Sequence, residues 1–219
     1  MSVQNSAETF IISRSKISHT IYQCYVLPVY AWLIQNIYPE QRILNSMLNT
    51  LVEACSRSSK VLVVRFDLHI REYSGQNSVI SQFSQKYSVF LKKEYPEVWC
   101  DLIWTREHGR SHRQHYHCVL LINGQKVHHP KTLRDQAKSL WATTTSGTFS
   151  LPINCFYLWK RGDMEMFSQI VYRLSYLAKN ITKKRTNPQV KFFGCKRITK
   201  HLKAVPTQPL HQLLNCATN

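Results

Sequence analysis

The chain has 219 residues, a formal net charge of +17 and an isoelectric point near 9.8. This length allows one substantial core with an appended segment, and the basic surplus with 11% aromatic residues favours a nucleic-acid partner over a basic protein with no specific partner. Seven dispersed cysteines, with no Cys-x-x-Cys pair, argue against a disulfide framework or a zinc knuckle and indicate reduced thiols in the cytoplasm. The longest apolar run, residues 25–34, is too short to span a bilayer, so we expect no membrane partner.

The N-terminal part is predicted to be accessory and mostly helical. Residues 1–20 are polar and without a pattern, whereas apolar residues from Ile43 to Cys55 recur at steps of three and four, as in a helix. No catalytic pattern is visible there. We therefore predict an accessory segment over residues 1–59.

The next segment, residues 61–70, alternates as a strand with two different faces. One face carries Val64, Phe66, Leu68 and Ile70, and the other carries Arg65, Asp67 and His69. The second face is either an ordinary solvated one or part of a site. In a site, Arg65 would lie near a phosphate, Asp67 would lie close to the metal or support a histidine, and His69 would be a further support.

A helix over residues 78–95 is followed by the predicted centre of the molecule, a hairpin. Its strands cover residues 98–106 and 115–123, joined by a loop rich in Gly, Ser and Arg. Because side chains alternate along a strand, His115 and His117 point to the same side. Glu107, at the end of the first strand, would lie beside this pair as a third ligand of a divalent metal ion.

The remaining elements are a helix after Pro130, a short strand over residues 155–160, a helix capped by Asp163, and a last strand over residues 190–199. On the helix that begins after Asp163, the side opposite the apolar stripe carries Tyr172, Tyr176 and Lys179, joined by Lys183 if the helix runs that far. Tyrosines that served only as core would lie in the apolar stripe, so this side is predicted to face a substrate.

Three segments together resemble the His-hydrophobe-His endonucleases, which include rolling-circle replication initiators, relaxases and single-strand transposases. They are Val63–Asp67, Glu107 with His115-Tyr116-His117, and the Tyr172–Lys179 segment with its Tyr-x-x-Lys spacing. The local sequences of these segments are also similar to those of prophage-borne replication proteins of the inovirus gene II product type. The resemblance covers residues 60–200.

The resemblance implies a function. A divalent ion, Mn²⁺ or Mg²⁺, on Glu107, His115 and His117 would polarise a DNA phosphate, and Tyr176 would attack it to give a 5′-phosphotyrosine and a free 3′-OH. Lys179 would favour the phenolate, and Tyr172 would act in a later step or support the site. Arg65, Arg106 and Lys183 are the expected DNA contacts.

The expected fold is α+β: an antiparallel sheet of about five strands with helices on one face and the metal site on the other, a core like that of ferredoxins and RNA-recognition motifs. The expected domains are residues 1–59, a catalytic domain over 60–203 and a tail over 204–219. The expected partners are single-stranded or origin DNA and the replication helicase and polymerase of a bacterial host of the phage or prophage. Alternatives are a transposase or mobilisation nickase, a basic nucleic-acid-binding protein that does not cut, and, more weakly, a structural zinc protein.

Overall fold

The computed structural model describes residues 8–10, 17–22, 25–30, 39–71, 73–108, 114–179, 190–198 and 209–214. The chain divides into two compact units. The first unit comprises Met1–Ser59, Trp159–Ile181 and Pro206–Asn219, and the second comprises Lys60–Leu158 and Thr182–Val205.

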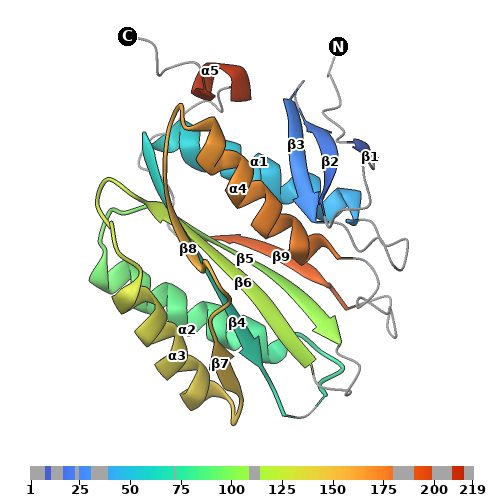
Figure 1. Ribbon diagram of the computed structural model, residues 1–219. Helices are drawn as coiled ribbons and strands as arrows, with labels where there is room; N and C mark the ends of the chain where they lie inside the picture. Colours follow the sequence, from blue (N-terminus) through green and yellow to red (C-terminus); the bar gives the residue numbers. More distant parts are fainter. Residues whose placement is uncertain are drawn as a thin grey trace. The chain divides into compact units, whose positions relative to one another are not determined.

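The second unit is built on an antiparallel sheet, so the predicted α+β fold is confirmed (Figure 1). The strand order is β7-β4-β6-β5-β9, and β8 also pairs with β4, giving six strands where about five were expected. The bounds are β4 Lys60–His69, β5 Cys100–His108, β6 Gln114–Asn123, β7 Thr148–Ser150, β8 Phe156–Lys160 and β9 Phe193–Arg197.

Helices α2 (Ser78–Glu94) and α3 (Lys131–Thr144) pack on one face of this sheet, as predicted. The alternation read from the sequence of β4 places Phe66 and its neighbours at i ± 2 in the core beneath them. The ring of Phe66 meets those of Phe83 and Tyr87 from α2 edge-on, with centroids 6.3 and 6.2 Å apart. One face of the sheet is thus occupied by packing, which leaves the opposite face for chemistry.

The predicted hairpin is confirmed, with β5 and β6 paired antiparallel over their whole length. β6 lies in the middle of the sheet, between β4 and β5. Its residues Cys118–Ile122 are buried, which explains why this part of the sequence is a continuous apolar run rather than an alternating one. A central, doubly flanked strand is a rigid support for the histidines at its start.

The first unit contains strands as well as helices. β1 (Glu8–Phe10), β2 (Ile17–Tyr22) and β3 (Tyr25–Tyr30) form a three-stranded antiparallel sheet, which the expectation of a mostly helical segment did not include. These strands are short and carry mixed polar and apolar residues, so their period is weak in the sequence. The predicted helix is present as α1 (Gln41–Arg57), and α5 covers Leu210–Leu214 in the expected tail.

The first unit also includes the helix expected in the catalytic domain. Helix α4 (Met164–Ser175) begins where Asp163 predicts, since the Asp163 Oδ1 accepts a hydrogen bond from the Met166 backbone N at 2.9 Å. It ends at Ser175 and continues as a 3-10 turn, η2 (Tyr176–Ala178), so it is shorter than the sequence suggested. Across the described ranges, no helix is both long and apolar enough to cross a membrane.

Candidate metal centre

Five titratable side chains on the second face of the sheet are brought together by strand register. Glu107 pairs with His115 across β5 and β6, while Asp67 pairs with His117 and His69 with His115 across β4 and β6. Because directly opposed residues of an antiparallel pair project to the same side, all five side chains lie on one face. This is the arrangement that the alternation of the two strands predicts.

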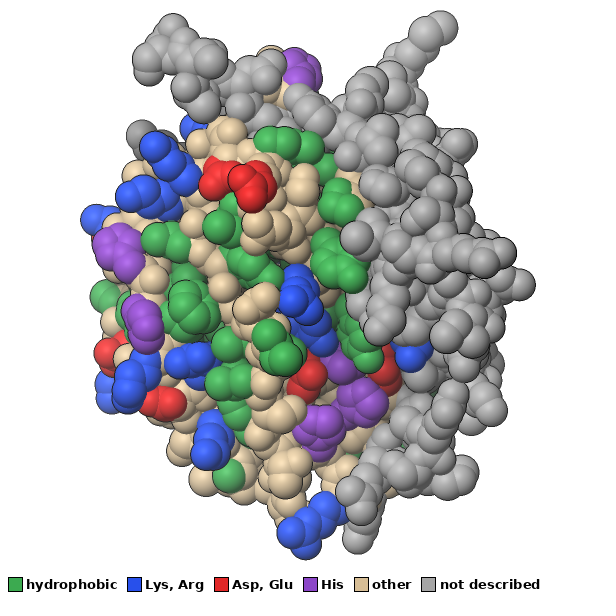
Figure 2. All heavy atoms as spheres, viewed as in Figure 1, with side chains coloured by type: hydrophobic (Ala, Val, Ile, Leu, Met, Phe, Trp, Pro, Cys, Tyr) green, Lys and Arg blue, Asp and Glu red, His purple; other side chains and the backbone are tan. Residues whose placement is uncertain are grey.

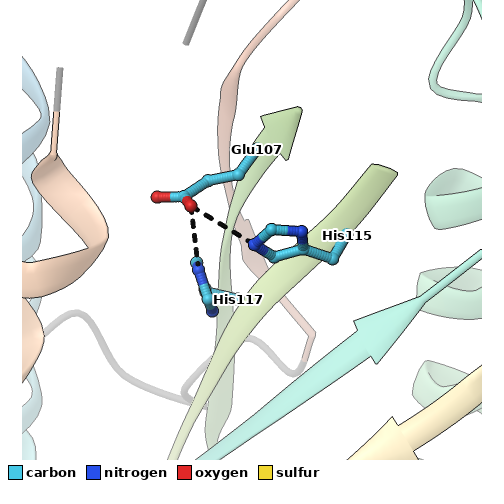
Figure 3. Close-up of side chains that lie close together, drawn as sticks. All are labelled: Glu107, His115 and His117. Atoms are coloured by element: carbon cyan, nitrogen blue, oxygen red, sulfur yellow. Dashed lines mark ion pairs between the residues drawn. The ribbon is translucent and has the colours of Figure 1, made fainter. Parts of the chain in front are cut away.

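Glu107, His115 and His117 form a compact group of potential ligands (Figure 3). The Glu107 Oε2 lies 3.2 Å from the His115 Nε2 and 3.4 Å from the His117 Nε2. One ligand atom from each residue lies within 4.8 Å of the others. Glu107 and His117 are buried, with 3% and 4% of their surfaces exposed, whereas His115 is half-buried.

Asp67 orients His117 from the side away from Glu107. The ring Nδ1–H of His117 donates a hydrogen bond to the Asp67 Oδ1 at 2.7 Å. This bond places a proton on Nδ1, so Nε2, on the Glu107 side of the ring, is the nitrogen that a metal ion could use. The expected supporting role of Asp67 thus has a geometric basis. Arg65 lies two residues before Asp67 on the same face of β4, and its Nε is 3.8 Å from the same Asp67 oxygen.

His69 extends the cluster along the edge of the site. Its ring centroid lies 5.4 Å from that of His115, and its Nε2 is 3.0 Å from the Oγ of Ser150 in β7. Gly147 allows this approach, because a Cβ at this position would collide with the backbone carbonyl oxygen of His69. His69 therefore lies beside the potential ligands, in the position expected for a supporting residue.

Electrostatics couple the buried groups of the metal-free protein. Burial alone would raise the pKa of Glu107, but the His115 and His117 rings hold it well below its usual value of 4.5. Burial would lower the pKa of His117, yet hydrogen bonds to Asp67 and Glu107 raise it above 6.5. The pKa of Asp67 is lowered, since the His117 ring and the Arg65 guanidinium outweigh the effect of burial. The carboxylates are therefore ionised, as metal ligands must be.

The donor set can hold a metal ion. Two imidazole nitrogens and one carboxylate suit borderline and hard divalent ions, and three protein ligands leave room for substrate or water. The Glu107 Oε1 is buried and has no hydrogen-bond partner among the described residues, so a second carboxylate atom is also available. A closed structural zinc site, in contrast, requires four ligands.

Arg106 lies on the opposite face of β5 and does not join this group. Only 3% of its surface is exposed, and its guanidinium donates to the carbonyl oxygens of Ser74 and Gln76, to the Asn77 Oδ1 (3.1 Å) and to the Gln114 Oε1 (2.9 Å). Through these hydrogen bonds, the two Nη atoms of the Arg106 guanidinium hold the turn before α2. Arg106, expected as a DNA contact, is therefore bonded within this turn and lies away from the metal-site face.

Tyr172, Tyr176 and Lys179 lie in the first unit, on α4 and the turn that follows it. Both tyrosines are half-buried, and the Lys179 Nζ lies 5.9 Å from the centroid of the Tyr176 ring. The predicted adjacency of Tyr176 and Lys179 is thus present, although a 3-10 turn rather than an α-helix produces it. Lys183 lies outside the described residues.

Some residues of the site were not predicted. Thr105 lies two residues before Glu107 on the same face and pairs with His117, so the alternation that located Glu107 also identifies it. Ser150 reaches His69 through the pairing of β7 with β4, which joins residues about 80 positions apart and leaves no local signal in the sequence.

These observations define an α+β protein whose sheet carries a histidine- and carboxylate-based group able to hold a metal ion. The chain belongs to the YagK/YfjJ C-terminal domain family, whose model matches residues 30–196. Neither the curated proteins nor the solved structures gave a significant match.

Proposed function

We propose that this protein is a metal-dependent single-strand DNA endonuclease and strand transferase, which nicks an origin to start rolling-circle replication of a phage, prophage or plasmid. The observation that carries the proposal is the Glu107, His115 and His117 group, oriented by Asp67 on the central strands. Its ligand types suit Mn²⁺ or Mg²⁺, and the net charge of +17 suits a polyanionic substrate.

The metal ion, when bound, would supply Lewis-acid polarisation of the scissile phosphate. Glu107, His115 and His117 would hold the ion, and the hydrogen bond from His117 to Asp67 fixes the ring so that its Nε2 is available as a ligand. In the proposal Arg65 stays beside Asp67 and adds positive charge to the site. Lys183 remains a proposed DNA contact.

The proposal assigns the attack to Tyr176. Its phenolic oxygen bonds to phosphorus while the bond from phosphorus to the 3′ oxygen breaks, and the departing 3′ oxygen takes up a proton. The nearby ammonium group of Lys179 favours loss of the phenolic proton, since a cation stabilises the phenolate. The resulting 5′-phosphotyrosine conserves the bond energy, so no ATP is needed to rejoin the strand.

Rejoining then reverses the same chemistry. The 3′-OH of an acceptor strand attacks the phosphotyrosine and releases the tyrosine, and a polymerase, assisted by a helicase, extends the first 3′-OH in between. Tyr172 precedes Tyr176 by one helical turn and is the proposed nucleophile or support of the later step.

A strand-exchange assay tests this proposal directly. Two single-stranded oligonucleotides that share a cleavage site and differ in length are incubated with the protein and Mn²⁺, without ATP. We expect hybrid strands that combine the 5′ part of one oligonucleotide with the 3′ part of the other. Simple cleavage without hybrids would indicate a hydrolytic nuclease, and an absence of cleavage over a broad set of strands would indicate a binding module that does not cut.

A further inference from the structure

Thr105 has a buried hydroxyl group whose hydrogen-bonding capacity is unused among the described residues. Its Oγ1 has no partner there, and the same is true of the Oε1 of Glu107. No part of the Thr105 surface is exposed, and only 3% of the Glu107 surface is. Buried polar atoms without a partner are costly and rare in native proteins. Both atoms therefore indicate a role that packing alone does not explain.

Strand register places Thr105 next to the metal centre. On β5 it lies two residues before Glu107, so both side chains project from the same face of the sheet. On β6 the residue directly opposite is His117, and opposed residues of an antiparallel pair have Cβ atoms about 5 Å apart. On the other side β9 places Phe193 opposite it, a side chain with no polar atom. Two members of the ligand group are thus neighbours of this hydroxyl.

The carboxylate of Glu107 has one engaged oxygen and one unused oxygen. Its Oε2 lies 3.2 Å from the His115 Nε2 and 3.4 Å from the His117 Nε2, whereas Oε1 has no partner among the described residues. A carboxylate oxygen accepts hydrogen bonds and a hydroxyl group donates one, so the two unused groups match chemically. Carboxylates that ligate a metal ion are usually hydrogen-bonded in turn, which fixes their orientation. A hydroxyl beside Glu107 can supply such a bond.

The burial of Thr105 separates it from any substrate. Figure 2 shows histidine side chains gathered beside acidic ones at the surface, and His115 is half-buried, so a ligand can reach the metal centre from outside. Thr105 has no exposed surface and cannot contact a DNA strand directly. Its hydroxyl can therefore affect the chemistry only through a neighbouring residue.

We infer that Thr105 is a positioning residue of the metal centre: when Glu107 ligates the ion through Oε2, the Thr105 hydroxyl donates a hydrogen bond to Oε1. The ion takes the place of the contacts from Oε2 to the two histidine rings, and the carboxylate is then free to turn toward Thr105. The bond holds Glu107 as a ligand through one oxygen and leaves room on the ion for water or substrate. This inference rests on the metal centre of the proposed function.

Metal affinity tests this role. Isothermal titration measures Mn²⁺ binding by wild type, by Thr105→Val, which replaces the hydroxyl with a methyl group of similar size, and by Thr105→Ser, which keeps the hydroxyl. We expect Thr105→Val to weaken binding by about 10- to 100-fold and Thr105→Ser to bind almost as wild type does. Thr50→Val is the matched control, because the Thr50 hydroxyl lies on α1 and donates to the Ser46 carbonyl oxygen at 2.8 Å. Its metal affinity should not change.

Urea unfolding in EDTA separates this role from a purely structural one. The Thr105 hydroxyl has no partner among the described residues, so Thr105→Val should keep or raise the urea midpoint of wild type. Thr50→Val, in contrast, loses a hydrogen bond and should lower the midpoint. A lower midpoint for Thr105→Val would assign the hydroxyl to the fold and overturn the inference.

Two results of the titration would also overturn it. One is wild-type Mn²⁺ affinity in Thr105→Val, and the other is an equal loss of affinity in Thr105→Ser. If either occurs while the wild-type protein still forms a covalent adduct with DNA, the proposed function stands and this inference alone is removed. An absence of Mn²⁺ binding by wild type would remove both.

Discussion

The carboxylate of Asp67 accepts a hydrogen bond from the Nδ1 of His117 at 2.7 Å, across the pairing of β4 with β6. A carboxylate behind a ligating histidine fixes its tautomer and makes the other nitrogen a better ligand. The strength of the metal centre should therefore depend on a residue that does not itself belong to the ligand group.

We predict that Asp67→Asn weakens Mn²⁺ binding by about 10- to 100-fold, because an amide cannot hold the imidazole in the same way. Isothermal titration of the metal measures the change. Asp101→Asn is the matched control, since Asp101 is also a buried carboxylate of the sheet but pairs with Leu121, away from the ligands. An unchanged affinity of Asp67→Asn would show that His117 needs no such support.

The metal-free protein should show a pH signature of His117. A histidine whose pKa is raised on folding contributes stability that is complete below about 6.5 and is lost as pH rises through the folded value. The lowered pKa values of Asp67 and Glu107 contribute stability that is present above 3.8 and 4.5 and is lost as pH falls. In EDTA, the difference in unfolding free energy between wild type and His117→Gln should therefore be largest between about pH 4.5 and 6.5.

Urea unfolding of both proteins at about pH 5.5 and about pH 8.5 measures this difference. A gap that widens toward the higher pH would contradict the assigned charges. The substitution of His117 by glutamine can change stability for reasons other than charge. The change with pH in the difference between the two unfolding free energies, rather than the difference itself, therefore reports the charge of His117.

Arg106 should matter for stability and not for DNA binding. Replacing it by glutamine removes the charged guanidinium that donates to Ser74, Gln76 and Gln114, and losing the hydrogen bonds of a charged donor costs about 1.5–3 kcal/mol. Urea unfolding measures the loss, and Arg71→Gln, at an exposed arginine, is the control. If Arg106→Gln kept wild-type stability and bound DNA more weakly, Arg106 would be a DNA contact, as the sequence suggested.

The two tyrosines should differ in the first cut. Tyr176 lies beside Lys179, whereas the third residue after Tyr172 is Ser175, whose hydroxyl donates to the Tyr172 carbonyl oxygen at 2.7 Å. Tyr176→Phe should therefore abolish the covalent DNA adduct, and Tyr172→Phe should preserve it while impairing later strand transfer. Mass spectrometry of the adduct peptide identifies the modified residue. Modification of Tyr172 with Tyr176 intact would reverse the assignment.

The sequence predicted those features that depend on local periodicity. Alternation in two strands was enough to place Glu107, His115 and His117 on one face and Asp67 beside them, because antiparallel pairing keeps opposed residues together. It could not show that Arg106 is buried, since a basic residue next to a site residue resembles a DNA contact until the turn at Ser74 is in place. The strands of the first unit are too short and mixed to stand out from the sequence.

The covalent adduct formed in Mn²⁺ tests the central claim most directly. Wild type and His117→Ala are incubated with single-stranded DNA in Mn²⁺ or in EDTA and separated on a denaturing gel, while anisotropy follows DNA binding. We predict an adduct only for wild type in Mn²⁺, with His117→Ala still binding DNA because phosphate charge dominates affinity. An adduct formed undiminished in EDTA, or by His117→Ala, would contradict the assignment of Glu107, His115 and His117 as the metal centre of a nicking enzyme.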